Sequence, residues 1–350
     1  MRKYIIAILT AAAGIAVLTA PDETSSAVAG AVHTCLEVVV PSLFAFTVLS
    51  IYLQRSGLMG IVLKPVTLPL SKLLRMNEEL CGILVMSNIG GYPVGAKMLC
   101  GAVKSGRMSS EDAGRMLCCC FGSGPSFVIG IVGRRVFGST LVGVLIFLAC
   151  FISQIIMAVW IRRGGEIRYT SADKTTDISA QSFISSVTDG ARVMYTVCVM
   201  ITGFAVVSSL IERFGSFWVT ERPLPLAEGI FPALLEVTQI KNIPHIGWWS
   251  ASLCAGLLSF GGVCVIMQVM AIAEGIPTKA FLRARIFSSL LSAILALPVG
   301  MLPLSTEQTM VQNVSVQPFT ESALMSLCVL GMCAVLLADE KPSMALRKSR

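Results

Sequence analysis

Charged residues and histidines are scarce in this chain of 350 residues. Asp, Glu, Lys and Arg together make up 13% of the sequence, whereas soluble globular proteins carry about a quarter. A chain with so little charge is not expected to cover a large water-facing surface with ionic side chains. The two histidines, His33 and His245, have no cysteine pair of zinc-finger spacing near them, which argues against a structural zinc site.

Apolar residues take the place of the missing charge. They account for 55% of the chain, and the mean hydropathy is +0.79. The sequence therefore predicts an all-α polytopic membrane protein that has the lipid bilayer as its solvent. The formal net charge of +7 is interpreted as a determinant of membrane topology, and no nucleic-acid partner is expected.

The twelve cysteines are interpreted as small apolar side chains within helices rather than as disulfides or metal ligands. No metal and no other cofactor is expected. Nine of the cysteines lie within apolar runs: Cys118, Cys119, Cys120, Cys150, Cys198, Cys254, Cys264, Cys328 and Cys333.

Motifs of enzymes are also missing. The sequence has no HExxH motif, no nucleophile-and-base pair and no acidic dyad within its apolar segments, so an enzyme is not expected. It has no Walker element either, so any pumping would need an ion gradient, a solute gradient or a partner.

Eight apolar segments are long enough to span a bilayer. The first resembles a signal peptide because Arg2 and Lys3 precede a short apolar run; a retained anchor is expected, and a cleaved signal peptide stays the alternative. The eight predicted spans are 4–20, 36–54, 113–132, 138–160, 189–211, 249–272, 284–302 and 321–338.

The distribution of lysine and arginine predicts that both termini are cytoplasmic. The opposite side would receive few cations, namely Arg134, Arg135, Arg213 and Arg222, and residues 21–35 and 303–320 have none. The cations placed on the cytoplasmic side are Arg2, Lys3, Arg55, Lys64, Lys72, Arg75, Lys104, Arg107, Arg162, Arg163, Arg168, Lys174, Lys279, Arg283, Arg285, Lys341, Arg347, Lys348 and Arg350.

The same order of parts occurs twice along the chain. Each half has a span, a short apolar segment interrupted by Gly or Pro (80–100 and 229–246), and two further spans. The charge count gives the halves opposite orientations, so the sequence predicts inverted repeats. The predicted divisions are an N-terminal anchor helix and external loop (1–35), a first repeat (36–160), a cytoplasmic linker (161–188), a second repeat (189–302), and an external loop, last span and basic tail (303–350).

The interrupted segments are predicted to be re-entrant hairpins. Irregular backbone is tolerated at membrane depth only where it is buried in protein or lines a wet cavity. In "SNIGGYPVGAK" (87–97), Gly91, Pro93 and Gly95 are predicted to form a bent tip. Lys97 either contacts solute or extends to the cytoplasmic surface. In "GIFPALLEVTQIKNIP" (229–244), polar residues crowd between two prolines, and the alternative is an external loop at the membrane interface.

The third span of each half carries a glycine-rich stretch, "FGSGPSFVIG" (121–130) and "LSFGGVCVIM" (258–267). Small residues allow close helix packing, which is one explanation. We favour the other, in which the backbone unwinds midway and faces the hairpins.

Four elements, "GGYPVGAK" (90–97), "CFGSGPSFVIG" (120–130), "LLEVTQ" (234–239) and "LLSFGG" (257–262), resemble the YlbJ-type sporulation integral membrane proteins of the nucleoside-recognition (Gate) domain group. The similarity covers nearly the whole chain, and G-[YF]-P-x-G-A is its most specific part. The resemblance implies a carrier that moves dipicolinic acid across the outer forespore membrane. It also implies that the protein is a multi-pass protein of the cell membrane.

The leading hypothesis is a secondary transporter of a small anionic solute; a nucleoside-type transporter and a non-transporting sporulation scaffold are the alternatives. A coupling ion and a homo-oligomer are left open. For a dianion, Lys97 and Lys241 would supply charge, and for a nucleoside, Asn88, Glu236 and Gln239 would supply neutral contacts together with Asn242. The predicted substrate-binding residues are Asn88, Gly91, Tyr92, Pro93, Gly95, Lys97, Ser123, Gly124, Ser126, Glu236, Thr238, Gln239, Lys241 and Ser259.

Overall fold

The computed structural model describes residues 2–170, 178–218, 225–243 and 247–301, and these residues form helices and connecting loops with no strand. The predicted span 321–338 lies outside them. Five helical segments are long and apolar enough to cross a membrane, so the chain is an all-α, integral multi-pass membrane protein. These segments are Pro21–Arg55, Thr140–Arg163, Ala180–Ile211, Ser250–Ile272 and Lys279–Gly300.

The N-terminal part is more helical than predicted. The expected span 4–20 corresponds to helix α1 (Arg2–Thr19), but residues 21–35, predicted as an external loop, form helix α2 (Pro21–Thr34). Pro21 stands at the start of α2, where a missing N–H costs nothing, and Asp22 and Glu23 lie in its first turn, where acidic groups favour the helix dipole. α2 continues through a π-helical turn, η1 (Cys35–Val39), into α3 (Val40–Arg55).

The predicted span 113–132 is not one helix. Gly122, Gly124 and Pro125 interrupt it: residues 121–124 are not helical, because glycine favours irregular backbone and proline lacks the N–H that a continuing helix needs. The helices after α3 in the first half are α4 (Met59–Val62), α5 (Lys64–Leu74), α6 (Glu78–Ile89), α7 (Tyr92–Lys104), α8 (Ser110–Leu117), the π-helix η2 (Ser126–Val136) and α9 (Thr140–Arg163).

The predicted linker 161–188 is shorter in the structure. α9 extends to Arg163, and α10 already begins at Ala180. Residues 180–188 contain no proline or glycine, so nothing in the local sequence stops the helix from continuing into the apolar run that follows. The second half consists of α10 (Ala180–Trp218), α11 (Pro225–Leu235), the 3₁₀ helix η3 (Val237–Asn242), α12 (Ser250–Phe260), α13 (Gly262–Ile272) and α14 (Lys279–Gly300).

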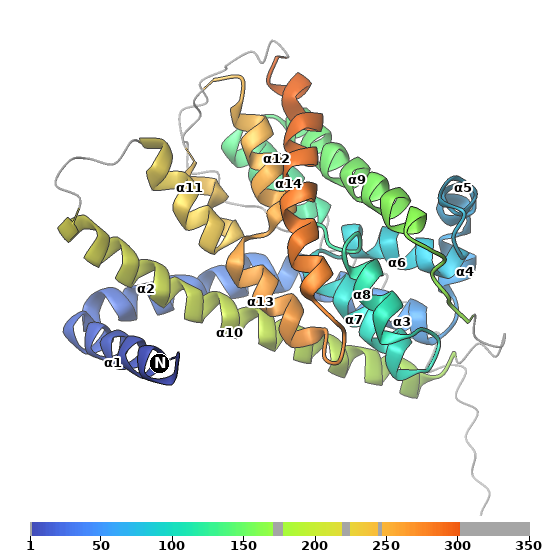
Figure 1. Cartoon of the computed structure of the whole chain (residues 1–350), viewed down its shortest axis with the longest axis horizontal. Helices are drawn as coiled ribbons and strands as arrows, with labels where there is room; N and C mark the ends of the chain where they lie inside the picture. The colour runs from blue at the N-terminus through green and yellow to red at the C-terminus, as the bar shows by residue number, and fades with distance from the viewer. Residues whose placement is uncertain (1, 171–177, 219–224, 244–246, 302–350) are drawn as a thin grey trace, which may run out of the picture.

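The two halves contain a similar order of helices, while their identity as repeats with re-entrant hairpins stays a prediction. A long helix (α3 or α10) is followed by a helical hairpin (α6–α7 or α11–η3), a broken helix (α8–η2 or α12–α13) and a further long helix (α9 or α14). Corresponding helices pack in pairs, α3 on α10 and α9 on α14, and Figure 1 shows α10 running along α2 and α3 beneath α12, α13 and α14. The inversion of the two halves stays a prediction.

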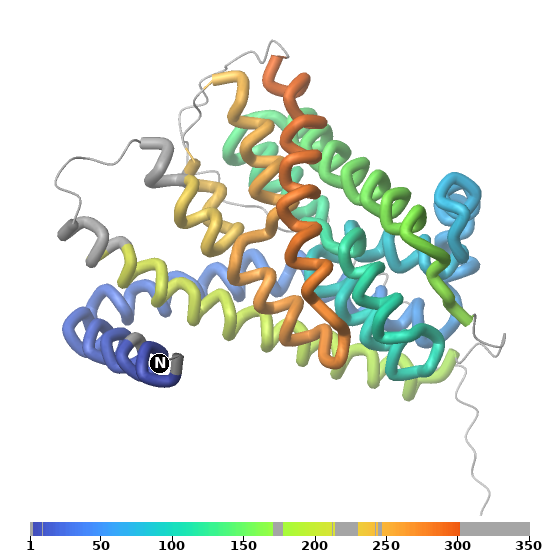
Figure 2. The backbone as a smooth tube through the Cα atoms, viewed as in Figure 1, coloured from blue at the N-terminus to red at the C-terminus, as the bar shows by residue number. Residues whose placement is uncertain are grey.

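The core lies where α6, α7, α8 and α12 converge. The tube in Figure 2 shows α13 passing over α10, while α12 lies further from α10. Nine of the ten cysteines in the described residues are buried, and all ten are free. Seven of the ten lie within helices, as interpreted, whereas Cys118, Cys119 and Cys120 follow the end of α8 and pack from non-helical backbone.

Candidate functional site

The tip of the first hairpin is a turn of two residues. α6 ends at Ile89 and α7 begins at Tyr92, so only Gly90 and Gly91 lie between the helices. Gly91 has φ 87°, which glycine adopts without steric cost. The bent tip is thus shorter than the predicted 87–97, because residues 87–89 and 92–97 are helical, and of the three residues predicted to form it only Gly91 lies in the turn, while Pro93 and Gly95 belong to α7.

Gly95 serves a different purpose from the one predicted. It lies within α7 with helical backbone, so positive φ does not explain it. A Cβ at this position would lie 2.2 Å from the carbonyl oxygen of Cys120, and a Cβ at Gly122 would lie 2.1 Å from Oδ1 of Asn88. Glycine at both positions lets the hairpin pack directly on the backbone that follows α8.

The first break in helix lies between α8 and η2, at residues 118–124. Gly124 packs against the hairpin tip, since a Cβ there would lie 3.2 Å from the carbonyl oxygen of Ile89 and 3.6 Å from the amide nitrogen of Gly91. The prediction that this segment unwinds and faces the hairpin is confirmed.

The second break is at Gly261 and Gly262, between α12 and α13, where φ is 85° and 75°. A Cβ at Gly262 would lie 3.3 Å from the carbonyl oxygens of Ala233, Leu234 and Leu235 at the end of α11. The second break therefore packs on the second hairpin, as the first break packs on the first.

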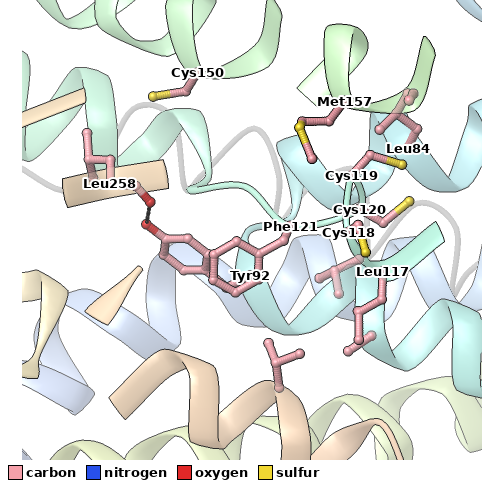
Figure 3. Packing of buried hydrophobic residues seen from close by; sticks show 14 of the residues in the cluster. Leu84, Tyr92, Leu117, Cys118, Cys119, Cys120, Phe121, Cys150, Met157 and Leu258 are labelled. Carbon is pink, nitrogen blue, oxygen red and sulfur yellow. Dashed lines mark hydrogen bonds between the residues drawn. The ribbon is translucent and has the colours of Figure 1, made fainter. Parts of the chain in front are cut away.

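The two breaks also contact each other. A Cβ at Gly261 would lie 2.5 Å from Cζ of Phe121, a residue of the first break. The Tyr92 ring packs on Phe121 with 4.8 Å between ring centroids, and the Tyr92 hydroxyl donates a hydrogen bond of 2.7 Å to the carbonyl oxygen of Leu258 (Figure 3). Residues from both hairpins and both breaks thus form one continuous packed region.

A small cavity of about 60 Å³ opens beside this region. Its volume is sufficient for a few water molecules and is well below the roughly 300–1,000 Å³ of typical small-molecule sites. In this structure the cavity is therefore too small for a drug-sized molecule. Seven of the predicted site residues line it: Gly91, Tyr92, Pro93, Ser123, Gly124, Glu236 and Thr238.

Glu236 supplies the carboxylate of this cavity. It is 3% exposed and precedes η3, where its Oε2 accepts hydrogen bonds from the backbone N–H of Thr238 (3.0 Å) and from the Thr238 hydroxyl. Among the described residues, its Oε1 has no hydrogen-bond partner. A buried carboxylate oxygen without a partner is costly, so Oε1 is suited to accept a hydrogen bond from a bound molecule.

The two lysines lie elsewhere. Lys97 Nζ is 3.1 Å from Oδ1 of Asp189 on α10, and Arg55 Nη2 is 2.5 Å from the other oxygen of the same carboxylate. Lys241 is exposed. Neither lysine lines the cavity, whose lining among the described residues includes no cationic side chain.

Five further predicted residues do not line the cavity either: Asn88, Gly95, Ser126, Gln239 and Ser259. Asn88 is buried and donates from Nδ2 to the carbonyl oxygen of Leu84 (2.9 Å). Ser126 is exposed at the start of η2, and the Ser259 hydroxyl pairs with that of Ser292. Asn88 and Gly95 pack against Gly122 and Cys120 of the segment that follows α8.

Sequence reasoning missed two buried polar residues, Gln268 and Arg285. Gln268 lines the cavity and interrupts the apolar run of α13, and that interruption was the available signal. Arg285 was counted only as a cation of the cytoplasmic side, which stays a prediction, and its complete burial (0% exposed) was not foreseen. Its spacing with Ser288 and Ser292, which places all three on one face of α14, was a signal for a buried polar stripe.

In comparisons with known proteins, no family model matches this chain, and no curated protein and no solved structure matches it. The resemblance to the YlbJ-type proteins stays a hypothesis, and the function has to be inferred from the geometry of the site.

Proposed function

We propose that this protein is a secondary membrane transporter that carries a small polar solute through the cavity beside the first helix break. The observation that carries the proposal is the position of Glu236. Its buried carboxylate oxygen has no hydrogen-bond partner among the described residues, and the residue lines a cavity walled by a hairpin tip and the first break. Ionisable groups between membrane helices are costly and mark solute or ion pathways.

The arrangement of broken helices supports transport. Interrupted helices at corresponding positions of two halves are typical of secondary transporters, in which the solute binds between the breaks. The tight cavity fits such a mechanism, because a carrier must close around its solute and a molecule larger than a few waters can enter only after the hairpins move.

The lining favours a neutral solute that donates hydrogen bonds, of the nucleoside type, over a dianion. Glu236 faces the cavity, whereas Lys97 is paired with Asp189 and Lys241 is exposed. A dianion beside an ionised carboxylate would be repelled, whereas hydroxyl and amine donors would satisfy its free oxygen.

One observation favours an anion as the second candidate. α7 begins at Tyr92 and η2 begins at Ser126, so the N-terminal ends of both helices are next to the cavity-lining residues Tyr92, Pro93 and Gly124. Helix N-termini carry partial positive charge, and an anion would be accepted if Glu236 bound a proton. Dipicolinic acid and the forespore membrane rest on the sequence resemblance alone.

The test is uptake by proteoliposomes of labelled uridine, adenosine and dipicolinate, with and without imposed proton and sodium gradients. We expect nucleoside uptake by the wild type. Glu236→Gln should reduce apparent affinity about tenfold to a hundredfold, since hydrogen bonds to charged groups contribute roughly 1.5–3 kcal/mol.

The matched control is Lys241→Gln, an exposed position five residues further along the same segment, which should leave uptake unchanged. Wild-type affinity in Glu236→Gln would remove this carboxylate from the site. Dipicolinate uptake without nucleoside uptake would select the second candidate. The absence of uptake for all three solutes under every gradient would favour the scaffold alternative.

A further inference from the structure

Arg285 occupies an unusual place for a cation. It lies within α14, one of the candidate spanning helices, and its side chain is completely buried. None of the ion pairs between described residues includes it. Burying a guanidinium without an ion pair between membrane helices carries a large desolvation free energy. Contacts with its surroundings must therefore offset that free energy.

Two backbone carbonyls from different halves of the chain accept hydrogen bonds from Arg285. Nη2 donates to the carbonyl oxygen of Cys118, directly after the last residue of α8, and Nη1 donates over 3.4 Å to that of Ser259, in the last turn of α12. Carbonyls at the end of a helix lack partners within the helix and carry partial negative charge. One guanidinium therefore serves as a shared C-terminal cap for the two helices that precede the two breaks.

Two aromatic rings, those of Phe121 and Phe281, pack beside the guanidinium and against each other, with 5.2 Å between their centroids. The central carbon of the guanidinium lies 4.3 Å from the ring centroid of Phe121 and 4.9 Å from that of Phe281, distances at which a cation is attracted to the ring. Phe121 belongs to the first break and packs against Gly261 of the second.

A continuous path of contacts connects Arg285 to the cavity. Phe121 packs on Tyr92, as Figure 3 shows, and Tyr92 lines the cavity. The Tyr92 hydroxyl bonds to the carbonyl oxygen of Leu258, one residue before the Ser259 carbonyl that Arg285 holds. Arg285 thus contacts both Phe121 and the end of α12, the two places against which Tyr92 packs. It does not itself line the cavity.

We propose that Arg285 is a positioning residue that locks the two helix breaks into one rigid unit and so sets the position of Tyr92 in the cavity wall. Lysine is a poor substitute, because a single ammonium cannot present a planar fork to two carbonyls while it also packs on two rings. The coupling of the breaks stands apart from transport, whereas its effect on solute binding rests on the proposed function.

Amide hydrogen exchange followed by mass spectrometry tests the coupling without any solute. The reporters are helix-end amides at each break: Cys119 and Cys120, which donate to the carbonyl oxygen of Met116, and Gly261, which donates to that of Leu257. In Arg285→Lys and Arg285→Gln, we expect exchange to accelerate about tenfold or more in the peptides that cover both breaks, with the smaller effect in the lysine variant. Arg283→Gln, an exposed cation two residues away, is the control and should not change either peptide.

Faster exchange at one break alone would overturn the proposal, since the two ends would then be independent. Equal acceleration in α9 would also overturn it, because Arg285 would then support the fold in general. Unchanged exchange at both breaks in Arg285→Lys, with the protein folded, would show that the fork geometry is not needed. If exchange accelerates at both breaks but proteoliposomes of the wild type take up no solute, the coupling holds and the proposed function fails.

Discussion

Replacing Gly95 by alanine is a direct test of how closely the first hairpin packs on the first break. Within a helix, this substitution ordinarily stabilises by about 1 kcal/mol. Here the new Cβ would lie 2.2 Å from the carbonyl oxygen of Cys120 and 2.8 Å from Cβ of Ser87. Overpacking a filled interior costs roughly 1–3 kcal/mol, and a backbone oxygen cannot rotate away. The clash should therefore exceed the helix gain and lower the free energy of unfolding by about 1–2 kcal/mol.

The assay is thermal unfolding of the purified protein in detergent micelles. The control is Gly203→Ala, which also lies within a helix, α10, but has no atom within 4 Å of its added Cβ. We expect the midpoint to fall by several degrees in Gly95→Ala and to stay constant or rise in Gly203→Ala. A midpoint at or above that of the wild type in Gly95→Ala would refute the close approach of the hairpin to the Cys120 backbone.

Three further predictions concern separate parts of the molecule. Lys97→Met should cost at most about 1 kcal/mol of stability, as is usual for partly exposed ion pairs, and should leave solute affinity within about twofold in uptake assays; a tenfold loss would place the lysine in the site. Tyr92→Phe keeps the ring contact but loses the hydrogen bond to Leu258, so the unfolding midpoint should fall by an amount equivalent to about 1 kcal/mol, and an unchanged midpoint would argue against that bond. Single cysteines at Ser139 and Gly164, introduced after removal of the native cysteines, should react with impermeant reagents from opposite sides of the membrane, because they flank the 24-residue helix α9; labelling from one side would contradict a spanning α9.

Composition and local pattern were sufficient for the class of protein and for most of the candidate spans. The predicted spans 36–54, 138–160, 189–211, 249–272 and 284–302 correspond to the five helical segments that can cross a membrane. The spans can be predicted because only a helix satisfies the backbone hydrogen bonds of a single segment in lipid. A long apolar run in a membrane is therefore expected to be helical.

The breaks could also be predicted, because they depend on local backbone chemistry. Gly91, Gly261 and Gly262 adopt positive φ, a conformation that favours glycine. Boundaries of helices were less predictable. Residues 21–35 and 180–188 were expected to be outside helices, yet they are helical. Residues 21–35 lack lysine and arginine, and residues 180–188 are polar, but neither property prevents a helix from forming.

What the sequence determined alone is thus the membrane class, the order of parts and the positions of the breaks, all of which follow from residues close together along the chain. The tertiary structure decided which polar side chains face the cavity. Lys97 meets Asp189 across 92 positions of sequence, and Arg285 reaches Cys118 across 167. The local sequence does not predict the partner of either cation, because a lysine or arginine at the end of an apolar run can equally well be exposed to solvent. Only the packing of α8, α12 and α14 brings two helix ends and two rings around Arg285, and that enclosure makes a buried cation tolerable.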